Sequence, residues 1–293
     1  FGIIRAFADK FGIQCNIGKL CQPVAQFGQY GSLCNNHFWD YTLFFLEMQG
    51  ISWYHRDIMN TLWTPRVLKI EQALQGQMRL VGGCVRDFLL NKTPDDTDIA
   101  TPLPPNQATD RLIRAGIPVR SVAPAHGVIQ ATVDGTSFEI TTLRQDIYTS
   151  RGERIVFIDD YRLDSVRRDF TVNALSLDRA GTLYDYHNGQ ADLQARTIRF
   201  IGDPATRLAQ DPLRILRYVR FWAGYGGKDP DNDILNLFPR FAPGLRHVSR
   251  TRQQKELSKI QSGPRAEQAQ DILHQTGVWT YLTLKENTHE HHQ

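Results

Sequence analysis

Runs of apolar residues with helical or alternating spacing divide most of the chain into predicted elements. Arg79 to Val81 is predicted to form a short buried strand, and Cys84 to Leu90 a helix with one apolar face. The diglycine Gly82-Gly83 between them predicts a turn without side chains, which would let backbone N–H groups at the helix start approach a phosphate. Asp96 to Ala100 is predicted to be the next strand. The same order of strand, glycine turn and helix is also common in α/β turns that bind no ligand.

Two β-rich runs follow, Val128 to Val133 and Thr136 to Leu143, and Asp134-Gly135 between them is a strong hairpin signal. The polar segment Gln145 to Asp160 is expected to be a mobile loop. An amphipathic helix is predicted next, from the stripe Val166, Phe170, Ala174 and Leu177. The remaining predictions for this part are a helix opened by Thr64-Pro65, a helix from Pro104-Pro105 to Ala115, a strand from Ile117 to Val122 and a last strand from Thr197 to Ile201.

From Pro204 onward the pattern is helical. An arginine stripe recurs about every third residue, at Arg207, Arg214, Arg217 and Arg220, and such a stripe is typical of a solvated helix face. Residues 240–265 contain seven basic residues and one acidic residue, Glu256. A helix of this composition either binds an RNA backbone or serves only solubility, and the sequence by itself leaves both interpretations open.

Asp96 and Asp98 are the first candidates for chemistry. On a strand, residues i and i+2 project from the same face, so the two carboxylates would lie side by side. Neighbouring carboxylates repel each other unless a cation lies between them, and hard oxygen ligands suit Mg²⁺. Glu139, between Phe138 and Ile140, is the candidate for a third carboxylate at a metal site. The alternative is that Asp-x-Asp forms a solvated strand edge or turn.

Composition narrows the class of protein without fixing its function. The 293 residues carry a net charge of +3, which permits a polyanionic partner without requiring one. The four cysteines lack Cys-x-x-Cys spacing, which favours free thiols in a cytoplasmic protein over a zinc site with His37. The longest apolar stretch, Phe38 to Tyr54, is interrupted by Asp40 and Glu47, so we expect no membrane span. No export signal is evident, and because the first residue is Phe1, the sequence is expected to be a fragment.

Three motifs follow one another along the chain. The first is the diglycine, the Arg86-Asp87 pair and the Asp-x-Asp. The second is Arg-Arg-Asp-Phe-Thr-Val-Asn-Ala, from Arg167 to Ala174, and the third is Gln-Asp-Pro-Leu-Arg, from Gln210 to Arg214. In this order they resemble the motifs of the tRNA nucleotidyltransferase (CCA-adding) and bacterial poly(A) polymerase family, within the polymerase β-like nucleotidyltransferases; the third is similar to Glu-Asp-x-x-Arg, with Gln210 in place of Glu. The resemblance covers residues 66 to about 275.

This resemblance implies an α+β fold: a nucleotidyltransferase head with a small mixed β-sheet and flanking helices, followed by an all-α neck. The head is assigned to residues 65–203 and the neck to 204–276, with 1–64 unassigned and 277–293 a disordered tail. The implied reaction is template-independent addition of CMP and AMP, from CTP and ATP, to the 3′ end of tRNA or another RNA. Asp96 and Asp98, with Glu139, would hold two Mg²⁺ ions.

The resemblance also implies which residues bind the substrates. Asp169 would accept from a ribose 2′-OH. Asp211 would accept the exocyclic amine of C or A while Arg214 donates to the ring nitrogen; alternatively, Asp211 caps a helix. The nucleotide-binding candidates are Gly82, Gly83, Arg86, Arg168, Asp169, Asn173, Asp211 and Arg214. The RNA-binding candidates are Arg246, Arg250 and Lys255. In relatives the loop equivalent to Gln145 to Asp160 becomes ordered around substrate, which implies Asp146 and Arg151 as further candidates for substrate contact.

Two alternatives to this function remain. A poly(A) polymerase would share these motifs, although Ala125-His126-Gly127-Val128 is more similar to the CCA-adding pattern His-Gly-Thr. A catalytically impaired RNA-binding protein would explain the departures at Val128, Gln210 and Thr251. Oligomeric state is left open.

Overall fold

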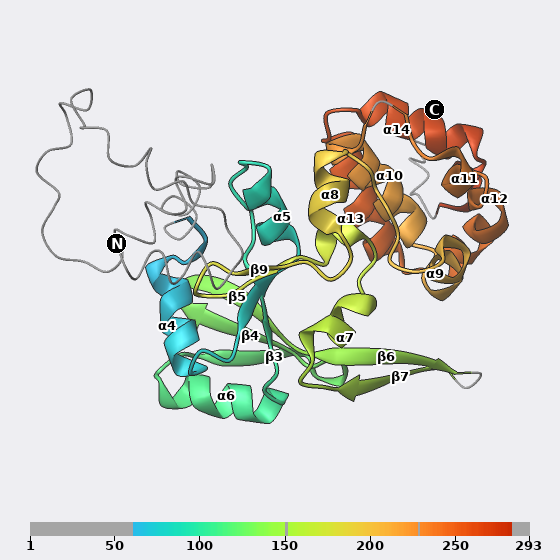
Figure 1. Ribbon diagram of the computed structural model, residues 1–293. Helices are drawn as coiled ribbons and strands as arrows, with labels where there is room; N and C mark the ends of the chain where they lie inside the picture. The colour runs from blue at the N-terminus through green and yellow to red at the C-terminus, as the bar shows by residue number, and fades with distance from the viewer. Residues whose placement is uncertain (1–60, 150–151, 228, 283–293) are drawn as a thin grey trace, which may run out of the picture. The chain divides into compact units, whose positions relative to one another are not determined.

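A computed structural model describes residues 61–149, 152–227 and 229–282 of the chain. These residues form one mixed sheet with flanking helices, a separate two-stranded hairpin and a group of helices that follows them in the sequence (Figure 1). The predicted α+β class is therefore confirmed. None of the helices in the described ranges is long and apolar enough to cross a membrane.

The sheet has seven strands in the order β3-β4-β5-β2-β1-β8-β9. Only β2 and β5 run parallel, and the other neighbours are antiparallel, so the sheet is mixed as predicted. The predicted hairpin is formed by β4 and β5, with Val133 opposite Thr136. The strand bounds are β1 (Arg79–Val81), β2 (Asp98–Thr101), β3 (Val119–Ala123), β4 (Val128–Val133), β5 (Thr136–Thr142), β8 (Ser176–Leu177) and β9 (Leu183–Tyr184).

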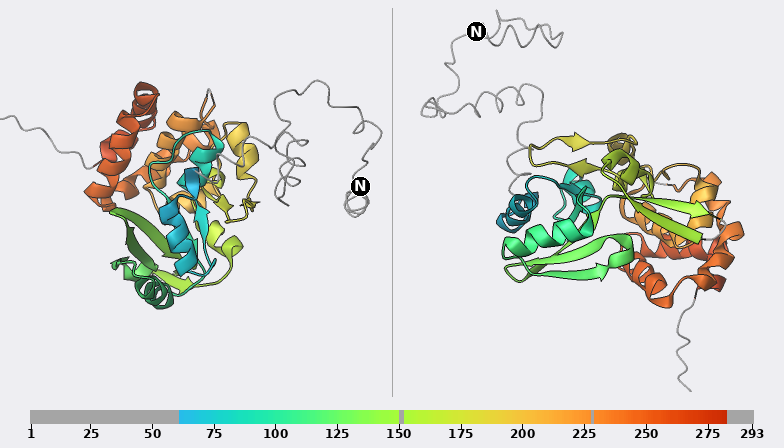
Figure 2. Two further views of the ribbon diagram at one scale, coloured as in Figure 1. Left: turned by 90° about the vertical axis from the view of Figure 1, so that its left-hand side faces the viewer. Right: turned by 90° about the horizontal axis from the view of Figure 1, so that it is seen from below.

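Two helices, α4 (Pro65–Ala73) and α6 (Pro105–Arg114), cover one face of this sheet (Figure 2). The start of α4 is fixed by Thr64, whose hydroxyl accepts from the Val67 amide at 3.4 Å, and by proline at the first helical position. Their apolar sides join the strands in one core, with Ile70, Leu80 and Ile140 almost fully buried. Both helices lie where the sequence predicted them.

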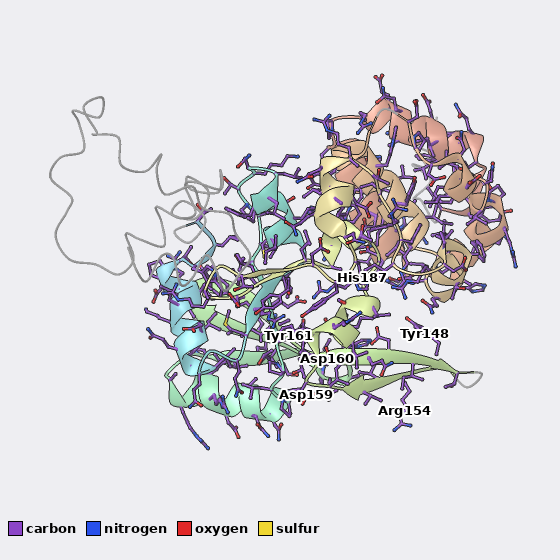
Figure 3. The ribbon with its side chains drawn as sticks, in the orientation of Figure 1. Tyr148, Arg154, Asp159, Asp160, Tyr161 and His187 are labelled. Carbon is purple, nitrogen blue, oxygen red and sulfur yellow. The ribbon has the colours of Figure 1, made fainter. Side chains whose placement is uncertain are left out.

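The segment expected to be a mobile loop is instead a β-hairpin, β6 (Arg144–Thr149) and β7 (Gly152–Phe157). Its strands pair from Arg144 opposite Phe157 to Thr149 opposite Gly152. Tyr148 and Arg154 project from opposite sides of the hairpin (Figure 3). The large apolar residues of this ribbon, Ile147, Tyr148 and Phe157, are each more than a third exposed, so it has no buried apolar face to mark it, and its composition resembles that of a loop.

The predicted amphipathic helix over residues 164–177 is also wrong. Only α7 (Tyr161–Val166) is helical, and the chain then passes through a 3-10 turn, η3 (Thr171–Asn173), into β8. Val166 is 49% exposed while Phe170 is fully buried, so the apolar residues do not share one helix face. The Asp169 carboxylate accepts from the Phe170 amide at 2.8 Å, a local hydrogen bond that replaces helical pairing.

The apolar core does not divide at the predicted boundary of residue 203. Phe170, Leu193 and Phe200 pack into the same cluster as the C-terminal helices. Leu193 lies on α8 (Gly189–Gln194), and the strand predicted at Thr197 to Ile201 is only a bridge between Phe170 and Phe200. The helices of this cluster are α9 (Pro204–Gln210), α10 (Arg214–Tyr225), α11 (Asn232–Leu235), α12 (Phe238–Phe241), η4 (Ala242–His247), α13 (Arg250–Gln261) and α14 (Ala266–Gln275).

The predicted disordered tail begins too early. A 3-10 turn, η5 (Val278–Tyr281), follows α14, and Val278 is fully buried in the helical cluster. The ring of Trp279 stacks on His274 with centroids 4.4 Å apart. Residues 283–293 and residues 1–60 of the unassigned segment 1–64 lie outside the described residues.

Candidate active site

A cleft of about 1380 Å³ separates the sheet from the C-terminal helices. The sheet wall consists of the lining residues up to Asn173, and the helical wall of those from Gln210 onward. Together the walls carry eleven Lys or Arg side chains against eight Asp or Glu, an excess that suits an anionic ligand. The lining includes most of the predicted site residues: Gly82, Gly83, Arg86, Asp96, Asp98, Arg168, Asp169, Asn173, Asp211, Arg214 and Lys255.

The predicted acidic cluster forms at the start of β2, by a different geometry from the one expected. Asp98 is the first residue of β2, but Asp96 lies in a bend before it and is not on the strand. Glu139 comes from the neighbouring parallel strand β5, where it is the register partner of Asp98. Asp98 and Glu139 are therefore neighbours on adjacent strands, and Asp96 lies in the bend just before β2.

These carboxylates perturb one another. The walls of the cleft limit solvation of Asp98 and raise the pKa of its carboxyl, and the charge of Asp96 raises this pKa further while Arg168 opposes the shift. The pKa of Glu139 is raised by limited solvation first, then by Asp98 and Asp96. No described residue donates a hydrogen bond to any of the three carboxylates. A bound cation would relieve this repulsion, and an all-oxygen donor set suits Mg²⁺.

The described residues contain no preformed group of three or more His, Cys, Asp or Glu side chains close enough to hold a metal ion. Asp96 and Asp98 are both in the cleft lining, whereas Glu139 is not. The fit to a metal thus rests on the first two carboxylates, with Glu139 as the neighbour that adds negative charge.

Gly82 joins the first two sequence motifs. Its φ of +73° is unfavourable for other residues, and a Cβ there would lie 3.1 Å from Nη1 of Arg168 and 3.7 Å from a carboxylate oxygen of Asp98. The missing side chain therefore lets the Arg168 guanidinium lie across the turn, beside the acidic cluster. Arg168 also bonds the Asn173 carbonyl at 3.3 Å and pairs loosely with Asp164 at 3.6 Å.

Arg86 is more strongly held than an exposed Arg-Asp pair would be. It is 6% exposed, pairs with Asp87 at 2.9 Å and donates to the amide oxygen of Asn173. From the helical wall, the Tyr225 hydroxyl donates to Asp87 at 2.9 Å and accepts from Arg86 at 3.2 Å. These contacts give Arg86 a positioning role: it ties α5 (Gly83–Leu89) to η3 and to the end of α10.

Asp169 is buried, and its carboxylate is almost fully used by the protein. One oxygen accepts from the Phe170 amide and from the Asn173 side chain at 3.0 Å, and the other accepts from Arg217 at 2.6 Å. Burial alone would raise the pKa of Asp169, but Arg217 and these hydrogen bonds hold it below its usual range. A ribose hydroxyl would have to share the second oxygen with Arg217.

The arginine stripe predicted to be a solvated face is instead part of the cleft and its support. Arg207 and Arg214 are only 7% and 8% exposed. Arg217 bridges Asp169 and Glu256, and Arg220 pairs with the same glutamate at 3.0 Å. Arg217 and Arg220 were therefore missed as site residues, although their spacing from Arg214 places them near the same wall.

The third motif lies where α9 ends and α10 begins. The Arg214 guanidinium donates to the Arg207 carbonyl at 2.8 Å and to the side-chain oxygen of Gln210 at 3.1 Å. Asp211 accepts from the Leu213 amide at 3.1 Å with one oxygen and from Arg252 at 2.8 Å with the other. Asp211 thus accepts a local backbone N–H in the turn between α9 and α10, where Leu213 and not Asp211 is the N-cap of α10, and its second oxygen faces a cation.

A basic stripe on α13, Arg252, Lys255 and Lys259, lines the same cleft at spacings of three and four residues. Of the three predicted RNA-binding residues, only Lys255 belongs to it. Arg246 lies on η4 with its guanidinium over the Tyr281 ring, 4.8 Å from the centroid, and Arg250 is also absent from the lining.

Comparison with known proteins places this geometry in a family. Residues 78–199 match the model of the poly(A) polymerase head domain. Over 215 residues the chain is 37% identical to the mitochondrial CCA tRNA nucleotidyltransferase 1 of Mus musculus, covering 72% of this chain and 50% of that protein. The CCA-adding enzyme of Geobacillus thermodenitrificans is also 37% identical, over 69% of this chain and 50% of its own. The chain belongs to the tRNA nucleotidyltransferase and poly(A) polymerase family.

A solved structure of a family member supports the same assignment. The Bacillus stearothermophilus CCA-adding enzyme in complex with CTP is 32% identical and superposes with a TM-score of 0.65. The match covers 74% of this chain and 53% of that one. The chain spans about half the length of the curated relatives it matches.

The family's His-Gly element is built into the edge of the cleft. His126 ends the 3-10 turn η2 (Pro124–His126), lines the cleft and accepts from Arg144 through its carbonyl at 2.7 Å. At Gly127, where φ is +67°, a Cβ would lie 2.5 Å from the Phe157 ring. Glycine is therefore required where the β6–β7 hairpin packs on η2. Of the two candidates in this hairpin region, Asp146 lines the cleft and Arg151 lies outside the described residues.

Proposed function

We propose that this chain is the catalytic part of a nucleotidyltransferase that adds CMP and AMP, from CTP and ATP, to the 3′ end of tRNA and releases pyrophosphate. The observation that carries the proposal is the pairing of two motifs across one cleft. The acidic cluster and diglycine form the sheet wall, and the Asp211 and Arg214 pair forms the opposite, helical wall. The relatives named above, including one solved with CTP, support this reaction class.

On the sheet wall, Asp96 and Asp98, with Glu139 beside them, would hold Mg²⁺. Mg²⁺ bound there would supply Lewis acidity toward the RNA 3′-OH and the triphosphate. Arg168 lies beside the cluster with one loose ion pair, so its guanidinium is placed to bind phosphate oxygens. Gly82 and Gly83 keep side chains out of the space that the phosphates need.

On the helical wall, Asp211 and Arg214 would select the base by hydrogen bonding. A carboxylate can only accept and a guanidinium can only donate. C and A both offer an amine donor beside a ring-nitrogen acceptor, whereas U and G offer a carbonyl beside a ring N–H. U or G would therefore place its carbonyl against the Asp211 carboxylate and its ring N–H against the Arg214 guanidinium, so that acceptor faces acceptor and donor faces donor.

The test is to offer tRNA lacking its terminal CCA together with each labelled nucleotide. We expect two additions from CTP and one from ATP, after which addition stops. Repeated addition from ATP alone would identify a poly(A) polymerase, the activity for which the matching head-domain model is named. Binding of tRNA without any addition would identify the RNA-binding alternative. Because relatives include a mitochondrial protein as well as bacterial ones, the expected cytoplasmic location stays a prediction.

A further inference from the structure

Gln210, the last residue of α9, holds two arginines with a single atom. Its side-chain oxygen accepts from Arg207 at 2.8 Å and from Arg214 at 3.1 Å. A guanidinium can only donate and the amide nitrogen cannot accept, so these two bonds fix which end of the amide faces the arginines. The NH₂ group of Gln210 must point away from them.

That NH₂ group is an unused donor at the cleft. Gln210 is half-buried and lines the cleft, and no described residue accepts from its amide nitrogen. Among the described residues, the buried side-chain atoms that lack a partner belong to Trp63, Arg207, Trp222, Arg250 and Glu256, so the Gln210 nitrogen remains in contact with solvent. A donor therefore stands beside Arg214, on the wall proposed to read the base.

A glutamate, which the family motif carries at this position, would present a different chemistry. Its carboxylate would place negative charge between Arg207 and Arg214 and would offer only acceptors. With glutamine the two guanidiniums have no counter-charge there, and burial, together with the charge of Arg214, lowers the pKa of Arg207 to about 10. The exchange of Glu for Gln thus changes an acceptor into a donor at the cleft surface.

The two bases differ at the position this donor can reach. Next to the ring nitrogen that would accept from Arg214, cytosine carries the O2 carbonyl, whereas adenine carries a C–H group. We propose that the Gln210 amide donates to O2 of cytosine and biases this site toward CTP over ATP. The inference rests on the proposed function, since it assumes that Arg214 faces the ring nitrogen.

The test is equilibrium binding of CTP and of ATP, without RNA, to the parent chain and to Gln210→Met and Gln210→Glu. Losing one neutral hydrogen bond in Gln210→Met should lower the CTP-to-ATP affinity ratio by about two- to twelvefold. Gln210→Glu should lower it further, because a carboxylate oxygen would face O2 of cytosine. Gln107→Met, on the exposed side of α6, is the matched control and should leave the ratio unchanged.

The affinity ratio separates this role from simple support of Arg214. If Gln210 only positions Arg214, both nucleotides weaken together in Gln210→Met and the ratio stays constant, which overturns the inference and leaves the proposed function standing. If the folded parent chain binds neither nucleotide, the proposed function falls and the inference falls with it. Circular dichroism of both variants establishes that they are folded before the ratios are compared.

Discussion

The acidic cluster on the sheet wall and the arginines on the helical wall carry opposite charges and are partnered in opposite ways. No described residue donates a hydrogen bond to the carboxylates of Asp96, Asp98 or Glu139, and the pKa values of the last two are raised. Across the cleft, Arg214 and Arg217 are each held by two or more protein acceptors. The carboxylates of the sheet wall are offset by nearby cations such as Arg168 but receive no hydrogen bond from any described residue, whereas the arginines of the helical wall are held in place by protein acceptors.

This difference matches two kinds of work. A metal site needs carboxylates whose repulsion is relieved only when the cation arrives, so leaving them unpartnered in the protein favours binding. Base selection instead needs donors and acceptors that cannot turn to suit the wrong base, which requires that their positions be fixed beforehand. The following predictions test whether the two walls can be disabled separately.

The largest effect is expected at Asp98. Asp98→Asn keeps the shape of the side chain but removes the charge that would hold Mg²⁺, so nucleotide transfer should fall by roughly two to three orders of magnitude. Initial rates of CMP addition to tRNA lacking CCA provide the measurement. Asp110→Asn, on the exposed side of α6, is the matched control. Near-parental transfer by Asp98→Asn would remove the sheet wall from catalysis.

Although Asp98→Asn should lower the rate of transfer, it should raise the stability of the folded chain. Because the pKa of Asp98 is raised in the folded chain, the ionised carboxylate costs stability at neutral pH, and this cost disappears as the pH falls below the folded pKa. In the absence of Mg²⁺ the variant should therefore melt at a higher temperature than the parent at pH 7. Adding Mg²⁺ should raise the melting temperature of the parent alone.

The ion pair of Asp169 and Arg217 connects the two walls. Asp169→Ala should lower the free energy of unfolding by about 3 kcal/mol, because it leaves Arg217 without its closest partner. Urea unfolding measures this loss. The exposed pair Lys69 and Asp134, 3.0 Å apart, is the control, and Lys69→Met should lower the free energy of unfolding by less than about 1 kcal/mol. Equal losses in the two variants would show that the Asp169 pair is no more important than a surface contact.

The ion pair of Asp169 and Arg217 also makes the stability of the folded chain depend on pH. Since the folded pKa of Asp169 is depressed, its contribution is present above the unfolded value of about 3.9 and is lost as the pH falls through the folded value. The free energy of unfolding should therefore fall less on acidification in Asp169→Ala than in the parent chain.

A smaller effect is expected along α13. Changing Arg252, Lys255 and Lys259 to Gln should weaken tRNA binding and reduce its salt dependence, by roughly 0.7 to 0.9 in slope for each phosphate that the stripe no longer neutralises. Arg246→Gln, away from the cleft, is the control. An unchanged salt slope in the triple variant would assign the stripe to solvation.

The smallest effect concerns base choice. In Asp211→Asn the side chain can still accept from the Leu213 amide, but it can also turn to donate. Addition of UMP or GMP relative to CMP should therefore rise by roughly tenfold in this variant. Comparison of all four nucleotides measures this. Unchanged selectivity in a folded, active variant would mean that Asp211 only supports the turn.

The sequence predicted the parts of the fold that have a clear apolar face. Helices α4 and α6 and the hairpin of β4 and β5 lie where expected because each buries one side on a common core. Prediction failed where the apolar pattern coincided with a helix by chance, as between Val166 and Leu177, and where a ribbon has no buried face, as in β6 and β7.

The residues that line the cleft were predictable only in part, since Glu139, Arg246 and Arg250 are absent from its lining, and their network of contacts was not predictable. Motif residues such as Asp98 and Asp211 lie in the cleft as expected. Arg217 was missed because its partners, Asp169 and Glu256, are 48 and 39 residues away in the sequence. The closeness of Asp98 and Glu139 depends on β2 pairing with β5, which no local pattern reveals.

The central claim is that the sheet wall performs the chemistry and the helical wall chooses the base. Equilibrium binding of CTP, ATP, UTP and GTP to Asp98→Asn tests it most directly. We predict that this variant, although inactive in transfer, still prefers CTP and ATP over UTP and GTP by the same ratios as the parent chain. Loss of that preference, with the fold intact, would contradict the division of work between the two walls.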